Sequence, residues 1–233
     1  MKKRFYKQVS VNSDDAGHHI LLDGRLLRSP AKGQLSLPNA GLAGAIADEW
    51  NAQTEEIDPA KMPLFSLAAT AVDRVTPQRP DLVAEMRAFG GNDLLCYWAD
   101  DTELASRQAI IWQPWLNWAK DRLRAPLEVT AGIMPISQPA TTIAALESAV
   151  EAHGDWELGM LHRVVSLCGS LVLGLAFLRR EMDQKSLFAA AFLDELWQSE
   201  QWGTDFEAED RRDFIKGELD DVARFLALLR GKK

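Results

Sequence analysis

The chain has 233 residues, of which 47% are hydrophobic and 26% charged, and its formal net charge is −8. These values are ordinary for a globular protein with one large domain or two small ones, and they exclude a disordered or low-complexity chain. The first residues are basic without a following apolar run, so we expect no signal or transit peptide and a cytoplasmic, bacterial protein. Cys96 and Cys168 lie in apolar surroundings without metal-type spacing, which predicts two reduced, buried thiols.

The N-terminal residues predict a small antiparallel meander. Residues 4–11 (RFYKQVSV) partly alternate between apolar and polar, and residues 18–22 also have strand character. Asp23 and Gly24 then predict a tight hairpin turn into a strand at residues 25–28. A last short strand is expected at residues 34–37. A meander of this size is marginal alone, so it must pack on a helix.

Helical patterns follow the meander. Asn39 is a good N-cap for a helix whose apolar residues keep helical spacing as far as Trp50. A second, mostly apolar helix is expected at residues 62–75, and proline breaks separate it from a third at residues 82–89. Gly90 and Gly91 are the best candidates for a boundary. We therefore predict a β-rich α+β domain at residues 1–90 and an all-helical domain at residues 91–233.

The second half predicts several further helices. Residues 102–123 place Trp112, Trp115 and Trp118 near one face, and Pro114 is expected to kink or restart that helix. Residues 187–201 and 207–229 predict two amphipathic helices. The apolar stripe of the last one comprises Phe214, Leu219, Val222, Phe225, Leu226 and Leu229.

The centre of this half is the segment RVVSLCGSLVLGLAFLR, with fifteen uncharged residues between Arg163 and Arg179. A helix that is apolar all round must be enclosed, and this one is shorter than the roughly twenty residues that span a bilayer. We therefore expect a buried core helix, in which Gly169, Ser170 and Gly174 allow neighbours to approach closely. The predicted fold class is α+β: a small N-terminal antiparallel meander with helices, followed by a multihelical domain around this buried central helix.

Charge is unevenly distributed along the chain. Residues 194–221 contain eleven acidic and three basic residues, whereas residues 1–33 contain seven basic and three acidic ones. The acidic segment disfavours nucleic acid, because phosphates would be repelled. It permits a basic protein partner, and a solvated helix face that aids solubility is an equally good interpretation.

The residues that could carry chemistry form no strong motif. His18 and His19 point to opposite faces of a strand. His153 and Glu157 have the spacing of a helical ligand pair, but no third ligand is evident, so we expect no metal and no other cofactor. No phosphate-binding loop or serine nucleophile elbow occurs. The carboxylate pairs Asp48/Glu49 and Asp194/Glu195 leave one alternative open, a small α+β enzyme that would use such a pair beside His162.

Tryptophan is the more unusual feature, with eight in the chain. Trp197 and Trp202 alternate with polar residues in the segment WQSEQWGTD, a pattern typical of interface anchors. An equally good interpretation places Trp197 in the core and makes Gly203 a helix C-cap.

Several collinear segments together carry a resemblance. They are RFYKQVSV, LLDGRLLRSP, LAGAIADEWNAQ, MPLFSLAATAVDRV, NDLLCYWAD, WQPWLNWA, VTAGI, CGSLVLGLA and DELWQSEQWGTDFEAE. In this order they cover nearly the whole chain, which resembles the assembly chaperone of the F-type ATP synthase that receives the alpha subunit of the catalytic head. The lack of a targeting extension fits a bacterial member.

The resemblance implies a non-enzymatic monomer that needs neither nucleotide nor cofactor and does not insert into membranes. It would bind the unassembled alpha subunit and cover the surface that a beta subunit later takes, because exposed interface in an orphan subunit is prone to aggregate. We hypothesise that two segments contribute to one client surface. The predicted partner-binding residues are Glu49 and Trp50 in the first, and Glu195, Trp197, Gln198, Trp202, Gly203, Asp205 and Glu207 in the second.

Overall fold

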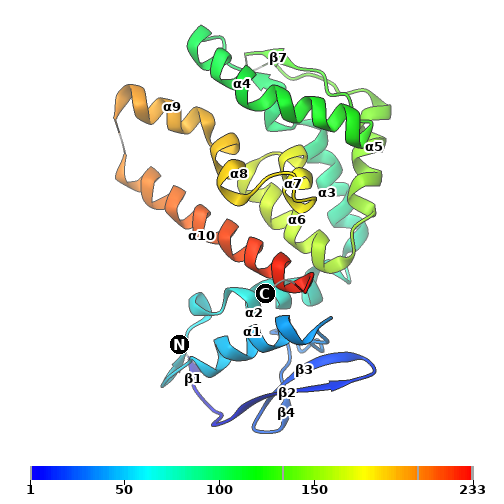
Figure 1. Ribbon diagram of the computed structural model, residues 1–233, viewed down its shortest axis with the longest axis vertical. Coiled ribbons are helices and arrows are strands. Elements are labelled where there is room, and N and C mark those ends of the chain that lie inside the picture. The colour runs from blue at the N-terminus through cyan, green and yellow to red at the C-terminus, as the bar shows by residue number, and fades with distance from the viewer. Residues whose placement is uncertain (1, 133, 204, 232–233) are drawn as a thin grey trace. The chain divides into compact units, whose positions relative to one another are not determined.

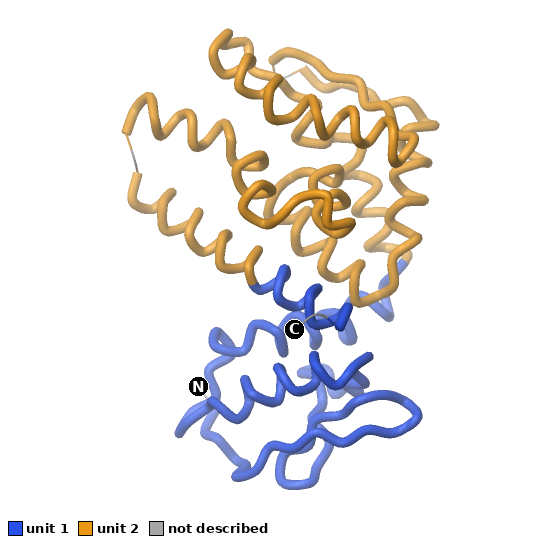
Figure 2. The backbone as a smooth tube through the Cα atoms, viewed as in Figure 1, with its two compact units in different colours: residues 1–79, 221–233 blue, residues 80–220 orange. Residues whose placement is uncertain are grey.

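The structure is a computed structural model that describes residues 2–132, 134–203 and 205–231. The chain divides into two compact units (Figure 2). Unit 1 comprises residues 1–79 and 221–233, and unit 2 comprises residues 80–220. These ranges differ from the predicted domains at 1–90 and 91–233. The first division falls before the paired glycines, and the end of the chain returns to unit 1, which no local sequence pattern indicates.

Unit 1 contains the predicted meander. β2 (Val9–Asp14), β3 (Gly17–Leu22) and β4 (Arg25–Leu26) form an antiparallel sheet in the order β2-β3-β4. The hairpin turn is confirmed: Asp23 and Gly24 have φ of 48° and 77°, as a type I′ turn requires. β1 (Lys2–Lys3) pairs separately with β5 (Glu56–Ile57).

Two of the predicted strands are wrong in extent. Between β1 and β2 the backbone leaves the extended ladder, because the N–H groups of Lys7 and Gln8 donate to the carboxylate of Asp23 instead of to a strand. Residues 34–37 contribute only isolated bridges, from Gln34 to Arg28 and from Leu37 to His18. The sheet is therefore smaller than the alternating pattern predicts.

The helices of unit 1 follow the sequence closely. α1 (Ala40–Asn51) packs against β2, β3 and α2, and Figure 1 shows it lying over the sheet. Its predicted N-cap is confirmed, since Asn39 Oδ1 accepts from Leu42 N at 2.9 Å. A 3₁₀ turn (Pro59–Lys61) precedes α2 (Pro63–Thr70), which continues as a π-helical turn (Ala71–Val75).

Unit 2 is built mainly from helices. The predicted all-helical half also contains a parallel pair of two-residue strands, β6 (Tyr97–Trp98) and β7 (Thr130–Ala131). No helix in the described part of the chain is both long enough and apolar enough to cross a bilayer. The remaining elements are α3 (Arg79–Gly91), a 3₁₀ turn (Leu94–Cys96), α4 (Thr102–Trp118), a π-helical turn (Ala119–Leu123), α5 (Ala140–Glu151), α6 (Asp155–Cys168), α7 (Leu171–Leu178), α8 (Gln184–Ala191), α9 (Leu193–Trp202) and α10 (Phe206–Leu229). The first residue of α3 and residues 221–229 of α10 belong to unit 1.

The central segment is enclosed as predicted, but the prediction of a single helix is wrong. α6 ends at Cys168 because Gly169 adopts a left-handed φ of 70°, and Ser170 then caps α7 by accepting from Leu173 N at 3.1 Å. Every residue of α7 is buried, and the helix packs against α4, α6 and α8. Figure 1 shows α7 among the other helices of unit 2. The two residues that seemed suited to close packing therefore serve as a stop and a start signal.

Gly174 does bring two helices close together. A Cβ atom at this position would lie 2.8 Å from Val165 Cγ2 and 3.0 Å from Leu161 Cδ1 of α6. We expect Gly174→Ala to lower the free energy of unfolding by about 1–3 kcal/mol, because the added methyl overpacks the contact. Gly217→Ala in α10 is the matched control, since a Cβ there meets nothing within 4 Å. Helix propensity makes that control neutral or stabilising by up to about 1 kcal/mol. Chemical denaturation measures both changes. If Gly174→Ala and Gly217→Ala change the free energy of unfolding equally, close packing of α6 on α7 is not the reason for glycine at position 174.

α4 runs through Pro114 without restarting, so of the two predicted effects, a kink or a restart, the restart is wrong. The ring removes the hydrogen bond to the carbonyl of Ile110, whose side chain is 75% exposed, so water can replace the lost donor. Trp112 is fully buried, and its Nε1 donates to Ala190 O at 2.8 Å. Trp115 and Trp118 lie nearer the surface, with ring centroids 6.4 Å apart.

The predicted helix at residues 187–201 is also divided, with α8 ending and α9 beginning around Phe192. α10 confirms the predicted last helix. Its core residues are Leu219, Val222, Phe225 and Leu226, whereas Phe214 is 60% exposed and does not belong to the buried stripe.

Candidate functional site

The end of α9 and the start of α10 carry an exposed aromatic group in unit 2. It consists of Trp202, Phe206 and Phe214, which are 74%, 81% and 60% exposed. Trp197 supports it from beneath: this indole is buried and meets the ring of Trp202 edge-on, with centroids 5.5 Å apart. Gly203 ends α9 with a φ of 91°, so the alternative interpretation of Trp197 as core and Gly203 as a C-cap describes both residues correctly.

Ion pairs hold the surroundings of this aromatic group together. Arg211 of α10 lies 3.1 Å from Glu195 of α9, and its guanidinium is 5.9 Å from the ring centre of Phe192. Lys216 pairs with Asp213 at 2.8 Å. Two of the three cations of the acidic segment are thus engaged locally and the third, Arg212, is buried, so the surface around the exposed rings keeps a negative charge.

The remaining predicted residues of this segment lie around the same helix end. Gln198 is exposed on α9. Asp205 caps α10, since its Oδ1 accepts from Glu207 N at 3.1 Å. Glu207 is exposed and has no ion pair with any residue that the structure describes. Unit 2 therefore brings together Glu195, Trp197, Gln198, Trp202, Gly203, Asp205 and Glu207.

Glu49 and Trp50 lie elsewhere, in the interior of unit 1. Glu49 is 8% exposed, and its two carboxylate oxygens accept from Leu64 N and Phe65 N, each at 2.9 Å. Burial raises the pKa of Glu49, and these two hydrogen bonds act in the opposite direction. The carboxylate therefore fixes the first turn of α2, where helix N–H groups otherwise lack acceptors.

Trp50 is equally enclosed. Its ring centre lies 4.9 Å from that of Phe65 and 5.6 Å from that of Tyr6, whose hydroxyl donates to Trp50 O at 2.6 Å. A role of Glu49 and Trp50 in partner binding stays a prediction. Because both side chains are buried, such a role would be indirect, through the residues that cover them. The hypothesis that they share one client surface with the segment of unit 2 also stays a prediction.

The groups considered for acid–base chemistry are each bound to a different partner. Asp194 Oδ1 accepts from Gln108 Nε2 at 2.9 Å, and burial raises the pKa of Asp194. His162 Nε2 lies 3.1 Å from Glu85 Oε2. His153 and Glu157 do meet, at 2.8 Å, but the described residues hold no group of three potential metal ligands. These contacts do not assemble a catalytic constellation.

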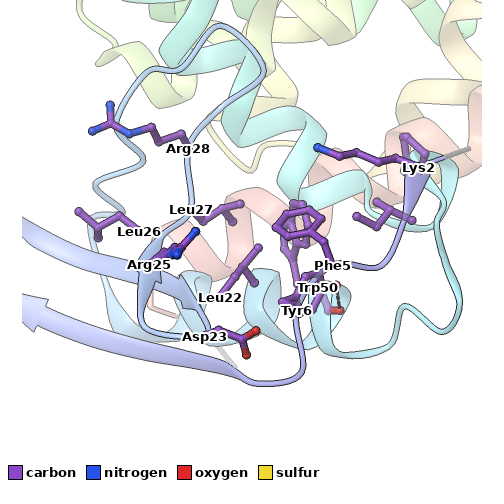
Figure 3. A pocket seen from close by; sticks show the side chains of 12 residues that line it. Lys2, Phe5, Tyr6, Leu22, Asp23, Arg25, Leu26, Leu27, Arg28 and Trp50 are labelled. Atoms are coloured by element: carbon purple, nitrogen blue, oxygen red, sulfur yellow. Dashed lines mark hydrogen bonds between the residues drawn. The ribbon is translucent and has the colours of Figure 1, made fainter.

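Sequence reasoning missed a cleft in unit 1, which we call the basic cleft (Figure 3). It encloses about 910 Å³ between the segment after β1 and the hairpin of β3 and β4. The signal that pointed to it was the excess of basic residues before residue 33, which the predicted sites did not use. Its lining comprises Lys2, Phe5, Tyr6, Leu22, Asp23, Arg25, Leu26, Leu27, Arg28, Trp50, Ile57 and Pro59.

Comparisons with known proteins point to one family. A family model described as ATP12 chaperone protein matches residues 3–120. The crystal structure of Atp12 from Paracoccus denitrificans is similar with a TM-score of 0.93 and 40% sequence identity, covering 98% of this chain and 99% of that one. The mitochondrial Atp12 protein of Schizosaccharomyces pombe is 24% identical over 215 residues, which are 87% of this chain and 74% of the relative. The Saccharomyces cerevisiae protein is 25% identical, covering 93% and 80%.

Proposed function

This chain belongs to the ATP12 chaperone family, and from that premise we propose that it is a chaperone of ATP synthase assembly that binds the unassembled alpha subunit. It shields the face of that subunit that later contacts a beta subunit. The affinity needs only to be lower than that of the final neighbour, so that the beta subunit releases the chaperone by exchange. The protein acts as a monomer in the cytoplasm, without nucleotide or cofactor.

The observation that carries this proposal is the exposed aromatic group of α9 and α10. Trp202 and Phe206 flank the junction of α9 and α10, and Phe214 lies about two turns further along α10, so exposed apolar side chains recur along one stretch of the chain. Exposed apolar area marks binding sites where it is contiguous. Tryptophan is also enriched among the few residues that dominate interface energies. The negative charge around these rings favours a client face with basic residues and disfavours nucleic acid.

The alternative, a small α+β enzyme with paired carboxylates, has less support. It requires a carboxylate pair in a cleft beside His162. The basic cleft has a single carboxylate in its lining, that of Asp23, and Glu49 and Asp194 are engaged by α2 and by Gln108. A non-enzymatic role therefore accounts better for the exposed rings and for the family.

Trp202 provides the direct test. We expect Trp202→Ser to weaken binding of purified alpha subunit roughly tenfold or more, because truncating a central aromatic anchor costs about 2 kcal/mol or more. The thermal melt should stay nearly unchanged, since the side chain is 74% exposed and surface substitutions usually change stability by less than about 0.5 kcal/mol. Both are measurable with tagged protein, by titration and by differential scanning fluorimetry.

Val11→Ser is the control, because Val11 is 40% exposed on β2 of unit 1, whereas the aromatic group belongs to unit 2. It should leave alpha-subunit binding intact. If Trp202→Ser binds as well as the parent chain, the aromatic group is not the client site. A collapse of the melting transition would instead make Trp202 a structural residue.

A further inference from the structure

We infer that the basic cleft of unit 1 is a docking site for an apolar peptide segment that carries carboxylates. The inference goes beyond the proposed function, because it concerns a different unit and a different charge from the aromatic group of α9 and α10. It also holds or fails independently of which subunit is the client.

The floor of the cleft is apolar and recessed. Tyr6, Leu22 and Trp50 are 4%, 5% and 6% exposed, so their rings and methyl groups form the base rather than the rim. Phe5 and Leu26, at 59% and 48% exposed, stand at its two sides in Figure 3. Removing these side chains from water is favourable at about 25 cal/mol per Å². A ligand therefore gains most by inserting apolar groups between Phe5 and Leu26.

The rim carries an excess of positive charge, because three cations line the cleft against one carboxylate, that of Asp23, with which Arg25 interacts electrostatically. Lys2, Arg25 and Arg28 line the cleft, and none of them forms an ion pair with a carboxylate of the described residues. Lys2 Nζ instead lies 4.8 Å from the ring centre of Phe5, and Arg28 Nη1 donates to the carbonyl of Lys32 at 3.0 Å. Three cations beside an apolar floor complement a ligand that is both apolar and anionic.

The acidic group of the lining is already occupied. Asp23 accepts from Gln8 N at 2.8 Å and from Lys7 N at 3.0 Å, and these hydrogen bonds lower the pKa of Asp23. Its charge thus holds the backbone that leads into β2. The charge that a ligand meets at the rim is therefore positive.

The shape of the site favours an elongated ligand. A second cleft of about 540 Å³ lies beside α2. Trp50, Ile57 and Pro59 line both clefts. Its walls include Met62, Phe65 and Ala69. Asp73, at its edge, is engaged as the acceptor for Ser29 Oγ and for Ala31 N. Because the two clefts have Trp50, Ile57 and Pro59 in common, apolar surface of unit 1 lies on both sides of these three residues.

A peptide fits this site better than a lipid surface does. Peripheral membrane proteins insert protruding apolar side chains beneath the headgroups. Here Tyr6, Leu22 and Trp50 lie recessed at the floor, so a partner that covers them must enter the cleft between Phe5 and Leu26. A peptide that carries both carboxylates and apolar side chains can pair with the cations of the rim and pack on the apolar floor.

Three short acetylated and amidated peptides test the inference against the full chain by calorimetric titration. One repeats Glu-Leu-Phe, the second Lys-Leu-Phe and the third Glu-Gly-Ser. We expect the Glu-Leu-Phe peptide to bind roughly tenfold or more tightly than either other peptide. Its affinity should fall at about 0.5 M salt, where exposed charges are screened.

A matched pair of double variants separates the cleft from the overall charge. Arg25→Glu with Arg28→Glu reverses the rim, whereas Lys3→Glu with Lys7→Glu makes the same change in net charge at exposed residues outside the lining. We expect the first pair to abolish binding of the Glu-Leu-Phe peptide and the second to leave it within about twofold. Both variants replace exposed side chains, so their melting transitions serve as the folding check.

Four outcomes would overturn the inference. The Glu-Leu-Phe peptide fails to bind, the Glu-Gly-Ser peptide binds equally well, or the two double variants weaken binding equally. The fourth is co-sedimentation of the chain with phosphatidylglycerol vesicles that Arg25→Glu with Arg28→Glu abolishes, which would make the cleft a lipid site. Because no alpha subunit is present in these titrations, their failure leaves the proposed function untouched.

Discussion

Replacing Asp93 with alanine is expected to lower the free energy of unfolding of unit 2 by about 3–5 kcal/mol, because it leaves several buried donors without an acceptor. Asp93 is fully buried. Its Oδ1 accepts from Leu95 N at 3.1 Å and from Ser170 Oγ at 2.7 Å, and its Oδ2 accepts from Val172 N at 2.9 Å. One carboxylate thereby joins the chain after α3 to the N-terminus of α7, the point at which the central segment is interrupted.

Denaturant unfolding with amide exchange at Val172 and Leu95 measures this effect. Asp101→Ala is the matched control, because Asp101 caps α4 through Glu103 N and Leu104 N, each at 2.9 Å, on the exposed surface. Loss of a cap of that kind costs about 1 kcal/mol. If Asp93→Ala and Asp101→Ala lower the free energy of unfolding equally, the burial of Asp93 does not increase its contribution beyond that of an exposed helix cap.

The pH dependence of Asp93 has a defined sign. Burial raises the pKa of Asp93 above its ordinary value of about 3.9, so the folded state binds more protons than the unfolded state between those two values. The stability that this group contributes is complete below about pH 3.9 and declines as the pH rises through the raised pKa. The advantage of the parent chain over Asp93→Asn should therefore shrink with rising pH. An advantage that grows would contradict this direction.

Glu49 gives the largest effect expected in unit 1. Glu49→Ala should lower the free energy of unfolding by about 2–4 kcal/mol, since the two N–H groups of Leu64 and Phe65 lose their acceptor inside the protein. Amide exchange at these two residues should accelerate most. The measurement also separates a structural role of Glu49 from a role in partner binding alone. If Glu49 served only to bind a partner, its replacement would leave both exchange rates unchanged.

Asp48 is the natural control for Glu49. The two carboxylates are neighbours on α1 and were a candidate catalytic pair, but Asp48 is exposed. Asp48→Ala should change stability by less than about 0.5 kcal/mol. If both substitutions destabilise equally, the bonds from Glu49 to α2 are not the reason.

The parts of the fold that sequence predicted are those with a local cause. Asn39 predicts the start of α1, Asp23 and Gly24 predict the hairpin turn between β3 and β4, and the uncharged residues of α7 predict that this helix is buried. Where prediction failed, the deciding partner is distant in sequence. Asp93 and Ser170 meet across many residues, and their contact holds the N-terminus of α7 at the point where the central segment is broken.

The candidate site, too, was predicted from the sequence only in part. The aromatic and acidic composition pointed to the end of α9, but a Trp-rich segment does not say which indole is outside. The exposed Trp202 and the buried Trp197 are distinguished only by the packing of α9. Glu49 and Trp50 sit in a helical pattern that suits a surface equally well, until α2 covers them. The basic cleft was hidden because its wall residues come from four separate stretches of the chain.

The last helix has a consequence for biosynthesis. Unit 1 begins at the N-terminus, yet residues 221–233 belong to it, and Asn39 Nδ2 donates to Leu228 O and Leu229 O at 3.0 and 2.9 Å. A nascent chain that still holds residues 221–229 in the ribosomal exit tunnel therefore cannot complete the unit whose strands and first helices were translated first. Folding of unit 1 must wait until this late segment has left the tunnel.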